Sequence, residues 1–238
     1  MSVRAVLFDV DGTLYHQQPL RMLMAGELGI VPWTRQAPWR VPGLWRMLSA
    51  FRRVREELRA LGVPEQPLVR LQYDAAAAAA GVPVDVMEAA VEEWIYRRPL
   101  KYLPRVARRG MAEVLASLAD EGLRAGVFSD YPVTDKLRAL GIDRAMTVAL
   151  EATAPEVNAF KPHPRGLALA CERWGLAPSE VVYVGDRFDV DGESALRAGM
   201  RCVIVSAAAP PPGAGGPCHL RDMRELPAAI RRFDEVPQ

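Results

Sequence analysis

Two patterns of hydrophobic and polar residues divide the chain. Short apolar runs that stop at a polar residue or glycine, such as 5–8 and 181–184, are typical of strands buried on both faces of a parallel sheet. Residues 15–99 show no such runs, and their apolar residues recur at three- and four-residue spacing, which predicts amphipathic helices. The pattern therefore predicts an α/β core, residues 1–14 and 100–238, with an inserted helical module of residues 15–99.

Glycine, proline and the apolar spacing set the expected boundaries of each element. In the inserted module we expect helices over 20–28 (ending near Gly29), 44–58, 68–80 and 84–97 (closed by Pro99). Beyond it we expect strands over 124–129, 146–150, 181–184 and 202–206, and helices over 106–121, 135–140, 165–174, 192–198 and 221–233. Residues 210–217, rich in proline and glycine, are expected to form a mobile loop.

Polar side chains follow the predicted strands at the points where each strand ends. Asp9 and Asp11 follow the first strand, Ser129 ends the second, and Asp186 and Asp191 follow the fourth. In an open parallel sheet, ligands bind outside the carboxyl ends of the strands, so these groups are expected to gather at one edge. A loop at residues 160–164 adds Lys161.

Carboxylates gathered at one edge repel one another, and without a cation their pKa values rise. Oxygen ligands from carboxylates and a substrate phosphate suit Mg²⁺. Lys161 supplies a second cation, and Ser129 offers a hydroxyl to a phosphate oxygen. Lysine at position 161 is informative because the chain has only 3 lysines among its 30 basic residues. The chemistry indicated is attack of a carboxylate on phosphorus to give an aspartyl-phosphate, with an acid/base group assisting the leaving alcohol and the attacking water.

Composition limits the binding partners and the cellular compartment that we expect for this protein. A net charge of +1 argues against nucleic acid as a stable partner. Three cysteines without a C-x-x-C pair, no signal-peptide pattern and no apolar run of membrane-spanning length favour a cytoplasmic protein that does not bind membranes. We expect a monomer or a homodimer.

Four segments in this order resemble the motifs of the haloacid dehalogenase (HAD) superfamily, subfamily I with a helical C1-type cap. They are DVDGT at 9–13, VFSD at 127–130, FKPHP at 160–164 and VGDRFDVDGESALRAGM at 184–200. The resemblance implies a Rossmann-like parallel-sheet core with an inserted all-helical cap domain. It also implies Asp9 as nucleophile and metal ligand, and Asp11 as general acid/base whose backbone carbonyl binds Mg²⁺. The other implied site residues are Ser129 and Lys161 for the phosphoryl group, with the neighbouring Thr13 and Asp130, and Asp186 and Asp191 for the metal.

The predicted function is Mg²⁺-dependent hydrolysis of a small phosphorylated metabolite. By the resemblance, dehalogenases of this fold lack an aspartate two residues after the nucleophile, so Asp11 favours phosphoryl transfer over 2-haloacid dehalogenation. A phosphomutase keeps the same motifs and stays open, and a non-enzymatic HAD-like binding module is disfavoured because no motif position is degraded. A receiver domain is disfavoured by the long helical insert. In the cap, four arginines are candidates to face an anionic substrate, although most are expected to be solvated: Arg21, Arg35, Arg40 and Arg46.

Overall fold

A computed structural model describes residues 2–34, 40–208, 210 and 218–235. Its centre is a parallel sheet of six strands in the order β3-β2-β1-β4-β5-β6. The strands are β1 (Ala5–Phe8), β2 (Arg124–Ser129), β3 (Met146–Glu151), β4 (Val181–Gly185), β5 (Arg201–Val205) and β6 (Cys218–Leu220). The predicted α/β class with a Rossmann-like parallel sheet is confirmed.

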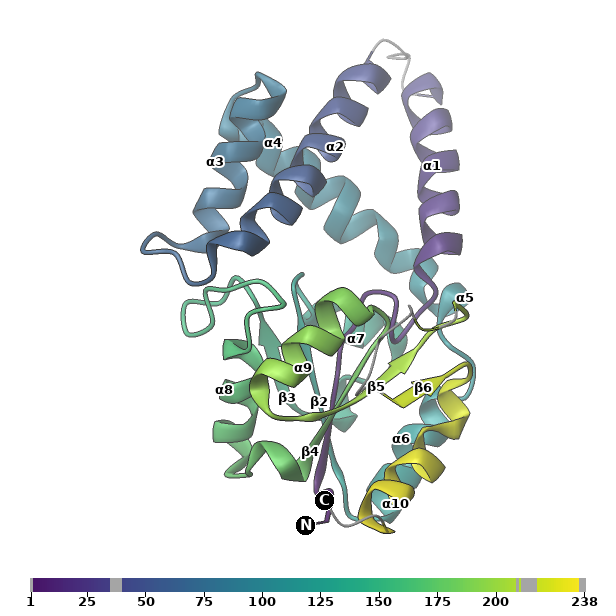
Figure 1. The fold of residues 1–238 in the computed structure, drawn as a ribbon. Helices are drawn as coiled ribbons and strands as arrows, with labels where there is room; N and C mark the ends of the chain where they lie inside the picture. The colour runs from purple at the N-terminus through teal and green to yellow at the C-terminus, as the bar shows by residue number, and fades with distance from the viewer. Residues whose placement is uncertain (1, 35–39, 209, 211–217, 236–238) are drawn as a thin grey trace.

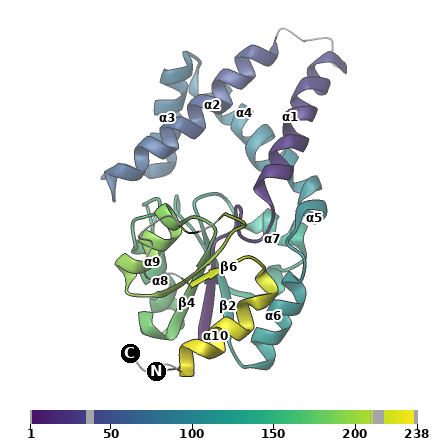
Figure 2. The same ribbon diagram turned by 45° about the vertical axis from the view of Figure 1, so that its right-hand side comes forward.

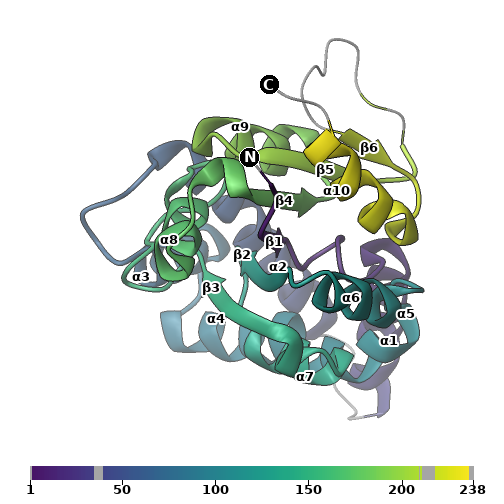
Figure 3. The same ribbon diagram turned by 90° about the horizontal axis from the view of Figure 1, so that it is seen from below.

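Helices cover both faces of the sheet. Those of the core are α5 (Leu103–Val106), α6 (Met111–Asp120), α7 (Thr134–Leu140), α8 (Arg165–Trp174), α9 (Glu193–Ala198) and α10 (Leu226–Glu235). Figure 3 shows α8 against one face and α6 with α10 against the other. Alternate residues of β1 serve the two faces: Val6 and Phe8 pack with α6 and α10, whereas Ala5 and Leu7 pack with α8.

The strand order places a crossover point beside β1. From β1 the chain builds outward through β2 and β3, then returns to add β4 on the other side of β1. Phe8 lies opposite Val184 in the β1–β4 register, so the residues that follow the two strands meet at the same edge. Crevices at such a switch point are where open α/β sheets bind ligands.

Further helices stand beyond the carboxyl ends of the strands (Figures 1 and 2). They are α1 (Gln17–Thr34), α2 (Arg40–Leu58), α3 (Leu68–Ala80) and α4 (Val84–Val91), followed by a π-helical turn (Glu92–Arg97) and a 3₁₀ turn (Arg98–Tyr102). Helices α2, α3 and α4 share a hydrophobic cluster of their own around the fully buried Phe51 and Met87. A separate cluster is the property expected of a module that packs independently of the sheet, and we interpret these helices as the predicted cap.

Several predicted boundaries are wrong. Helix α1 continues past Gly29 to Thr34, because a glycine inside a helix costs only about 1 kcal/mol and need not end it. The helix expected from residue 106 begins at Met111, after Gly110 takes a positive φ of 80°. The helix expected over 84–97 changes to a π-helical turn at Glu92, and the short edge strand β6 was not predicted.

Two further expectations concern the loop and the membrane. The predicted mobile loop at 210–217 lies, except for residue 210, outside the described residues. Among the helices that are described, none has the length and hydropathy that crossing a membrane requires.

Candidate active site

Asp9 is held at the crossover point, directly after β1. Its backbone N–H donates to the carbonyl of Val184 at 2.8 Å, which continues the β1–β4 ladder by one residue. The Thr13 hydroxyl donates to Asp9 Oδ2 at 2.9 Å. Asp9 is 4% exposed, so its carboxylate is almost fully buried.

Three carboxylates meet here. Oxygens of Asp9, Asp186 and Asp191 all lie within 4.8 Å of one another. Gly12 makes this approach possible: its φ is 103°, and a Cβ there would lie 2.2 Å from Asp186 Oδ2. In the part of the chain that the structure describes, the Asp186 carboxylate accepts no hydrogen bond and forms no ion pair.

Lys161 is the ammonium that joins two of these carboxylates. Its Nζ donates to Asp9 Oδ1 at 2.6 Å, to Asp191 Oδ1 at 2.7 Å and to the Tyr183 hydroxyl at 3.0 Å. The side chain is 3% exposed. Burial alone would lower the pKa of Lys161, but the charges of Asp191 and Asp9 outweigh burial and raise it well above its usual value.

One ammonium does not neutralise three carboxylates. Burial raises the pKa of Asp9 well above its usual value, and Asp191 and Asp186 add to that shift against the opposing charge of Lys161. Burial, together with the charge of Asp191, raises the pKa of Asp186 to about 6. The cluster therefore carries more negative charge than its partners compensate, which is the electrostatic condition for binding a cation.

The Asp191 carboxylate has a different set of hydrogen-bond donors from those of Asp9 and Asp186. Its Oδ2 accepts the backbone N–H groups of Asp186 and Arg187, both at 3.1 Å, and its Oδ1 accepts from Lys161 and Tyr183. Four donors use most of the lone pairs of this carboxylate. Asp191 thus holds the loop after β4 and the Lys161 ammonium in place.

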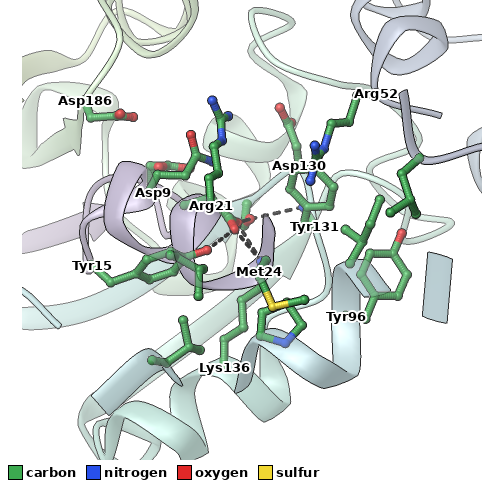
Figure 4. Close-up of a pocket in the computed structure, with 18 of the residues that line it drawn as sticks. Asp9, Tyr15, Arg21, Met24, Arg52, Tyr96, Asp130, Tyr131, Lys136 and Asp186 are labelled. Carbon is green, nitrogen blue, oxygen red and sulfur yellow. Dashed lines mark hydrogen bonds and ion pairs between the residues drawn. The ribbon is translucent and has the colours of Figure 1, made fainter. Parts of the chain in front are cut away.

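Asp11 faces a second group of donors. Lys136 from α7 donates to Asp11 Oδ1 at 2.6 Å and to Oδ2 at 2.7 Å, Ser129 Oγ donates at 3.1 Å, and the Tyr15 hydroxyl also donates. Two of these donors, Tyr15 and Lys136, are labelled in Figure 4. Burial would raise the pKa of Asp11, but the Lys136 charge and these hydrogen bonds outweigh it and lower the pKa. Asp11 is therefore ionised in this structure.

Asp130 forms the border between the core and the cap. Its Oδ2 accepts at 2.6 Å from Arg59, which lies in the 3₁₀ turn (Arg59–Leu61) that follows α2, and its Oδ1 accepts the backbone N–H of Lys161 at 3.1 Å. Arg59 also donates to the Lys161 carbonyl, and Arg55 donates to the Asp130 carbonyl, both at 2.6 Å. The carboxyl-terminal end of α2 is thereby fixed to the loops that carry Ser129 and Lys161.

A cavity of about 530 Å³ opens between this edge of the sheet and the cap. Of the eight predicted site residues, seven line it: Asp9, Asp11, Ser129, Asp130, Lys161, Asp186 and Asp191. Thr13 does not line the cavity, because it is fully buried behind Asp9. Of the four cap arginines, Arg21 lines the cavity and Arg46 does not, while Arg35 and the Arg40 side chain lie outside the described part of the chain.

Sequence reasoning missed three groups that hold the site residues: Lys136, Tyr15 and Tyr183. The scarcity of lysine that points to Lys161 applies equally to Lys136 and is the signal that could have found it. A tyrosine within an otherwise aliphatic strand, as Tyr183 is in β4, is a weaker signal of a buried polar role.

Comparisons with known proteins agree with this architecture. A family model described as haloacid dehalogenase-like hydrolase matches residues 3–199. The phosphoglycolate phosphatase of Escherichia coli K12 is 29% identical over 219 residues, covering 82% of this chain and 78% of the relative.

Two solved structures share the fold. The 2-haloacid dehalogenase of Pseudomonas syringae pv. Tomato has a TM-score of 0.68 at 22% identity, covering 97% of this chain and 99% of its own. A HAD phosphatase of Thermococcus onnurineus has a TM-score of 0.64 at 24% identity, covering 96% and 98%. A protein named as a dehalogenase and a protein named as a phosphatase thus share this fold. The fold by itself therefore does not distinguish dehalogenation from phosphate hydrolysis.

Proposed function

This chain belongs to the haloacid dehalogenase-like hydrolases, and we propose that it is a Mg²⁺-dependent phosphatase that hydrolyses a small phosphate monoester through an aspartyl-phosphate on Asp9. The observation that carries the proposal is the Asp186 carboxylate. It lies within 4.8 Å of Asp9 and Asp191 and, among the described residues, has no hydrogen-bond donor of its own. Cleavage of a carbon–halogen bond needs no cation at this place, whereas a phosphoryl group approaching a carboxylate does.

The residues present fit a divalent cation. The donors are carboxylate oxygens, which are the ligands that Mg²⁺ prefers. Asp9 and Asp186 would hold it with the Asp11 backbone carbonyl, while the four donors already on Asp191 favour an indirect part for that residue. When bound, the ion neutralises phosphoryl charge next to the nucleophile.

In the first step an Asp9 carboxylate oxygen forms a bond to phosphorus, and the bond from phosphorus to the ester oxygen breaks. Lys161, which donates to Asp9 Oδ1, and Ser129 lie where they can bind the phosphoryl oxygens. The departing alkoxide takes a proton from the Asp11 carboxyl. In the second step Asp11 takes a proton from water, and the resulting hydroxide attacks phosphorus, which releases Asp9 and inorganic phosphate.

The ionised Asp11 of this structure is the form required in the second step. For the first step Asp11 must gain a proton and so weaken its pairing with Lys136, because a protonated carboxyl no longer attracts the ammonium. An alcohol that leaves easily, such as a phenol, depends least on that proton. Poor leaving groups are therefore the substrates on which Asp11 acts most strongly.

Similarity to a known enzyme supports phosphate chemistry. The relative named above is a phosphoglycolate phosphatase, and its 29% identity extends over 82% of this chain. The three cysteines are free thiols in the structure, which suits the cytoplasmic setting that we propose. The size of the assembly, monomer or homodimer, stays a prediction.

The test is hydrolysis of p-nitrophenyl phosphate with and without Mg²⁺, using Asp186→Asn and the matched control Asp189→Asn. Asp189 lies in the same loop, but it is exposed and paired with Arg187 at 2.6 Å. We expect activity that requires Mg²⁺, loss of that activity in Asp186→Asn, and little change in Asp189→Asn. Full activity in excess chelator, or halide release from a 2-haloacid in place of phosphate release, would overturn the proposal.

A further inference from the structure

Two arginines of the cap face the cavity without a partner. Arg21 of α1 and Arg52 of α2 both line it, and neither donates a hydrogen bond to, or forms an ion pair with, any described residue. Figure 4 shows Arg21 on the Asp9 side of the cavity and Arg52 on the side of Asp130 and Tyr131. The other two arginines of the lining differ, because Arg59 is paired with Asp130 and Arg187 with Glu56 and Asp189.

The Arg52 guanidinium is affected by the charge of Arg21. Desolvation in the cleft lowers the pKa of Arg52 from its usual value, Tyr131 opposes this change, and the positive charge of Arg21 lowers the pKa further. Like charges that converge on one space without an acidic partner are stabilised when an anion enters that space. Asp9 and Asp11 do not serve as this anion, since Lys161 and Lys136 already pair with them, and Asp186 forms no ion pair with either arginine in the described part of the chain.

Much of the remaining cap wall is apolar, next to the polar Gln17, Glu56, Arg59 and Tyr96, and part of it is open to solvent. Met22 is 75% exposed and Trp45 is 44% exposed, although both line the cavity. The apolar lining from the cap includes Met22, Met24 and Leu28 of α1, Trp45 and Leu48 of α2, and Trp94 of the π-helical turn. Apolar side chains left in contact with water inside a cleft gain free energy when a ligand covers them.

A cavity of about 530 Å³ with charged groups on the core side and a largely apolar cap wall has room for a ligand larger than a two-carbon ester. We propose that the cap selects phosphate monoesters whose alcohol half combines an apolar body with a second anionic group, the apolar body lying on the α1–α2 wall and the second anion between Arg21 and Arg52. The inference rests on the proposed phosphatase function and adds the class of substrate. The phosphoryl group occupies the core side and the second anion the cap side of one cavity.

The test compares four esters of primary alcohols, so that leaving groups are similar. They are benzyl phosphate, 4-carboxybenzyl phosphate, ethyl phosphate and phosphoglycolate. We expect kcat/KM for 4-carboxybenzyl phosphate to exceed that for benzyl phosphate by about tenfold, the usual size of one charge-assisted contact. We expect a similar advantage of 4-carboxybenzyl phosphate over phosphoglycolate, which carries the anion without the apolar body.

Variants then assign the effect to the two arginines. In the double variant Arg21→Gln/Arg52→Gln, the ratio of 4-carboxybenzyl to benzyl phosphate should fall to about one. The control is Arg53→Gln, which keeps the ratio, because Arg53 is exposed and pairs with Glu57 at 3.6 Å on α2. A parent ratio near one, a ratio that survives in the double variant, or a preference for phosphoglycolate would each overturn the inference.

Failure of the inference is distinguishable from failure of the proposed function. A parent that hydrolyses benzyl phosphate but shows no preference for the carboxylated ester keeps the phosphatase and loses the substrate class. A parent that hydrolyses p-nitrophenyl phosphate but none of the four esters likewise keeps the phosphatase and loses the substrate class. A parent that hydrolyses neither p-nitrophenyl phosphate nor any of the four esters loses the phosphatase function, and the substrate class is refuted with it. Calorimetric binding to Asp9→Asn gives the same comparison without turnover, and equal affinity for the two benzyl esters would again refute the arginine pair.

Discussion

The two walls of the cavity differ in the burial and the pairing of their charged groups. On the core side the charged groups are buried and paired, as Lys161 is with Asp9 at 2.6 Å and Lys136 with Asp11 at 2.6 Å. On the cap side Arg21 and Arg52 have no partner among the described residues, and Met22 stays 75% exposed. On the core side the one requirement left is a cation to balance the carboxylates. On the cap side the arginines and the exposed apolar side chains still need a ligand as their partner.

This difference separates the reaction from the choice of substrate. Groups that stabilise a transition state act best when they are fixed beforehand by packing and by further hydrogen bonds, and the strand ends of the core provide that fixation. Groups that recognise the variable half of a substrate need only be accessible and chemically complementary. The predictions below therefore expect large effects on the core side and small effects at the outer surface of the cap.

The largest effect is expected from Asp11→Asn. An amide can neither protonate the leaving alcohol nor take a proton from water, and general acid/base groups contribute about 10²–10⁴-fold. We expect a loss of that size in kcat for an alkyl phosphate and a smaller loss for an aryl phosphate, with a burst of phenol because dephosphorylation becomes limiting. Rapid-mixing kinetics on both substrates measure this.

A matched control is Asp135→Asn on α7, next to Lys136. Asp135 is exposed, does not line the cavity and, among the described residues, pairs with Arg138 at 3.2 Å, so its variant should retain the activity of the parent. Equal losses for both substrates in Asp11→Asn without a burst, or loss of Mg²⁺ binding, would mean that the Asp11 side chain acts as a metal ligand. The division of roles between Asp9 and Asp11 would then be wrong.

The next effect concerns stability. Lys161→Met leaves Asp9 and Asp191 buried without their ammonium, and breaking a buried pair costs about 3–5 kcal/mol. Lys101→Met is the control: Lys101 is half exposed, and its partner Glu27 keeps Arg98, so the loss should stay below about 1 kcal/mol. Urea unfolding in the presence of chelator measures both. Similar losses in the two variants would show that the core side is no more tightly fixed than the surface.

The core side was the more predictable of the two from the sequence. Residues of local motifs at strand ends are placed by the sheet itself, so Asp9, Ser129 and Asp186 could be assigned to one edge before the structure was known. Lys136 was missed, because its role comes from a contact between elements far apart in the chain: it reaches Asp11 across 125 residues. Tyr15 was missed for another reason, because it lies only 4 residues from Asp11 and its hydroxyl meets that carboxylate only in the folded turn after β1.

The cap was predictable as helices but not as a binding surface. Period and alanine content indicate α3, which spans the predicted residues, yet no periodicity tells which arginines find a carboxylate. Arg59 meets Asp130 only because the end of α2 docks on the loop after β2, and Arg52, about two turns earlier, meets no carboxylate among the described residues. Which arginines of the cap form ion pairs depends on how the helices pack, so it cannot be predicted from the local sequence pattern.

A third effect is the pH dependence of Mg²⁺ binding. The pKa of Asp186 is about 6, so below that pH a proton competes with the ion, and affinity falls about tenfold per pH unit. We expect Kd at pH 5 to be about tenfold weaker than at pH 7 by calorimetry, with little change between pH 7 and 8. An equal Kd at pH 5 and pH 7 would contradict this assignment.

The raised pKa of Asp186 also determines whether the metal-free protein becomes more or less stable as the pH rises. The folded pKa of Asp186 lies above its ordinary value of 3.8, so the folded state holds a proton that the unfolded chain has released. Stability should therefore decrease as the pH rises from about 4 to 6, by an amount on the order of 3 kcal/mol. Asp186→Asn should remove this slope, and an unchanged slope in the variant would assign it to another group.

The smallest effect is expected on the outer face of α1, where Ile30 is 63% exposed. Ile30→Gln removes little packing, and substitutions at such positions usually change stability by less than about 0.5 kcal/mol. Leu20 on the same helix is 7% exposed and packs into the core cluster, so Leu20→Ala should cost about 2–5 kcal/mol. Urea unfolding compares the two variants directly. A loss above about 1 kcal/mol in Ile30→Gln would mean that this face of α1 is covered in solution, and the cap would then be less open than its cavity wall indicates.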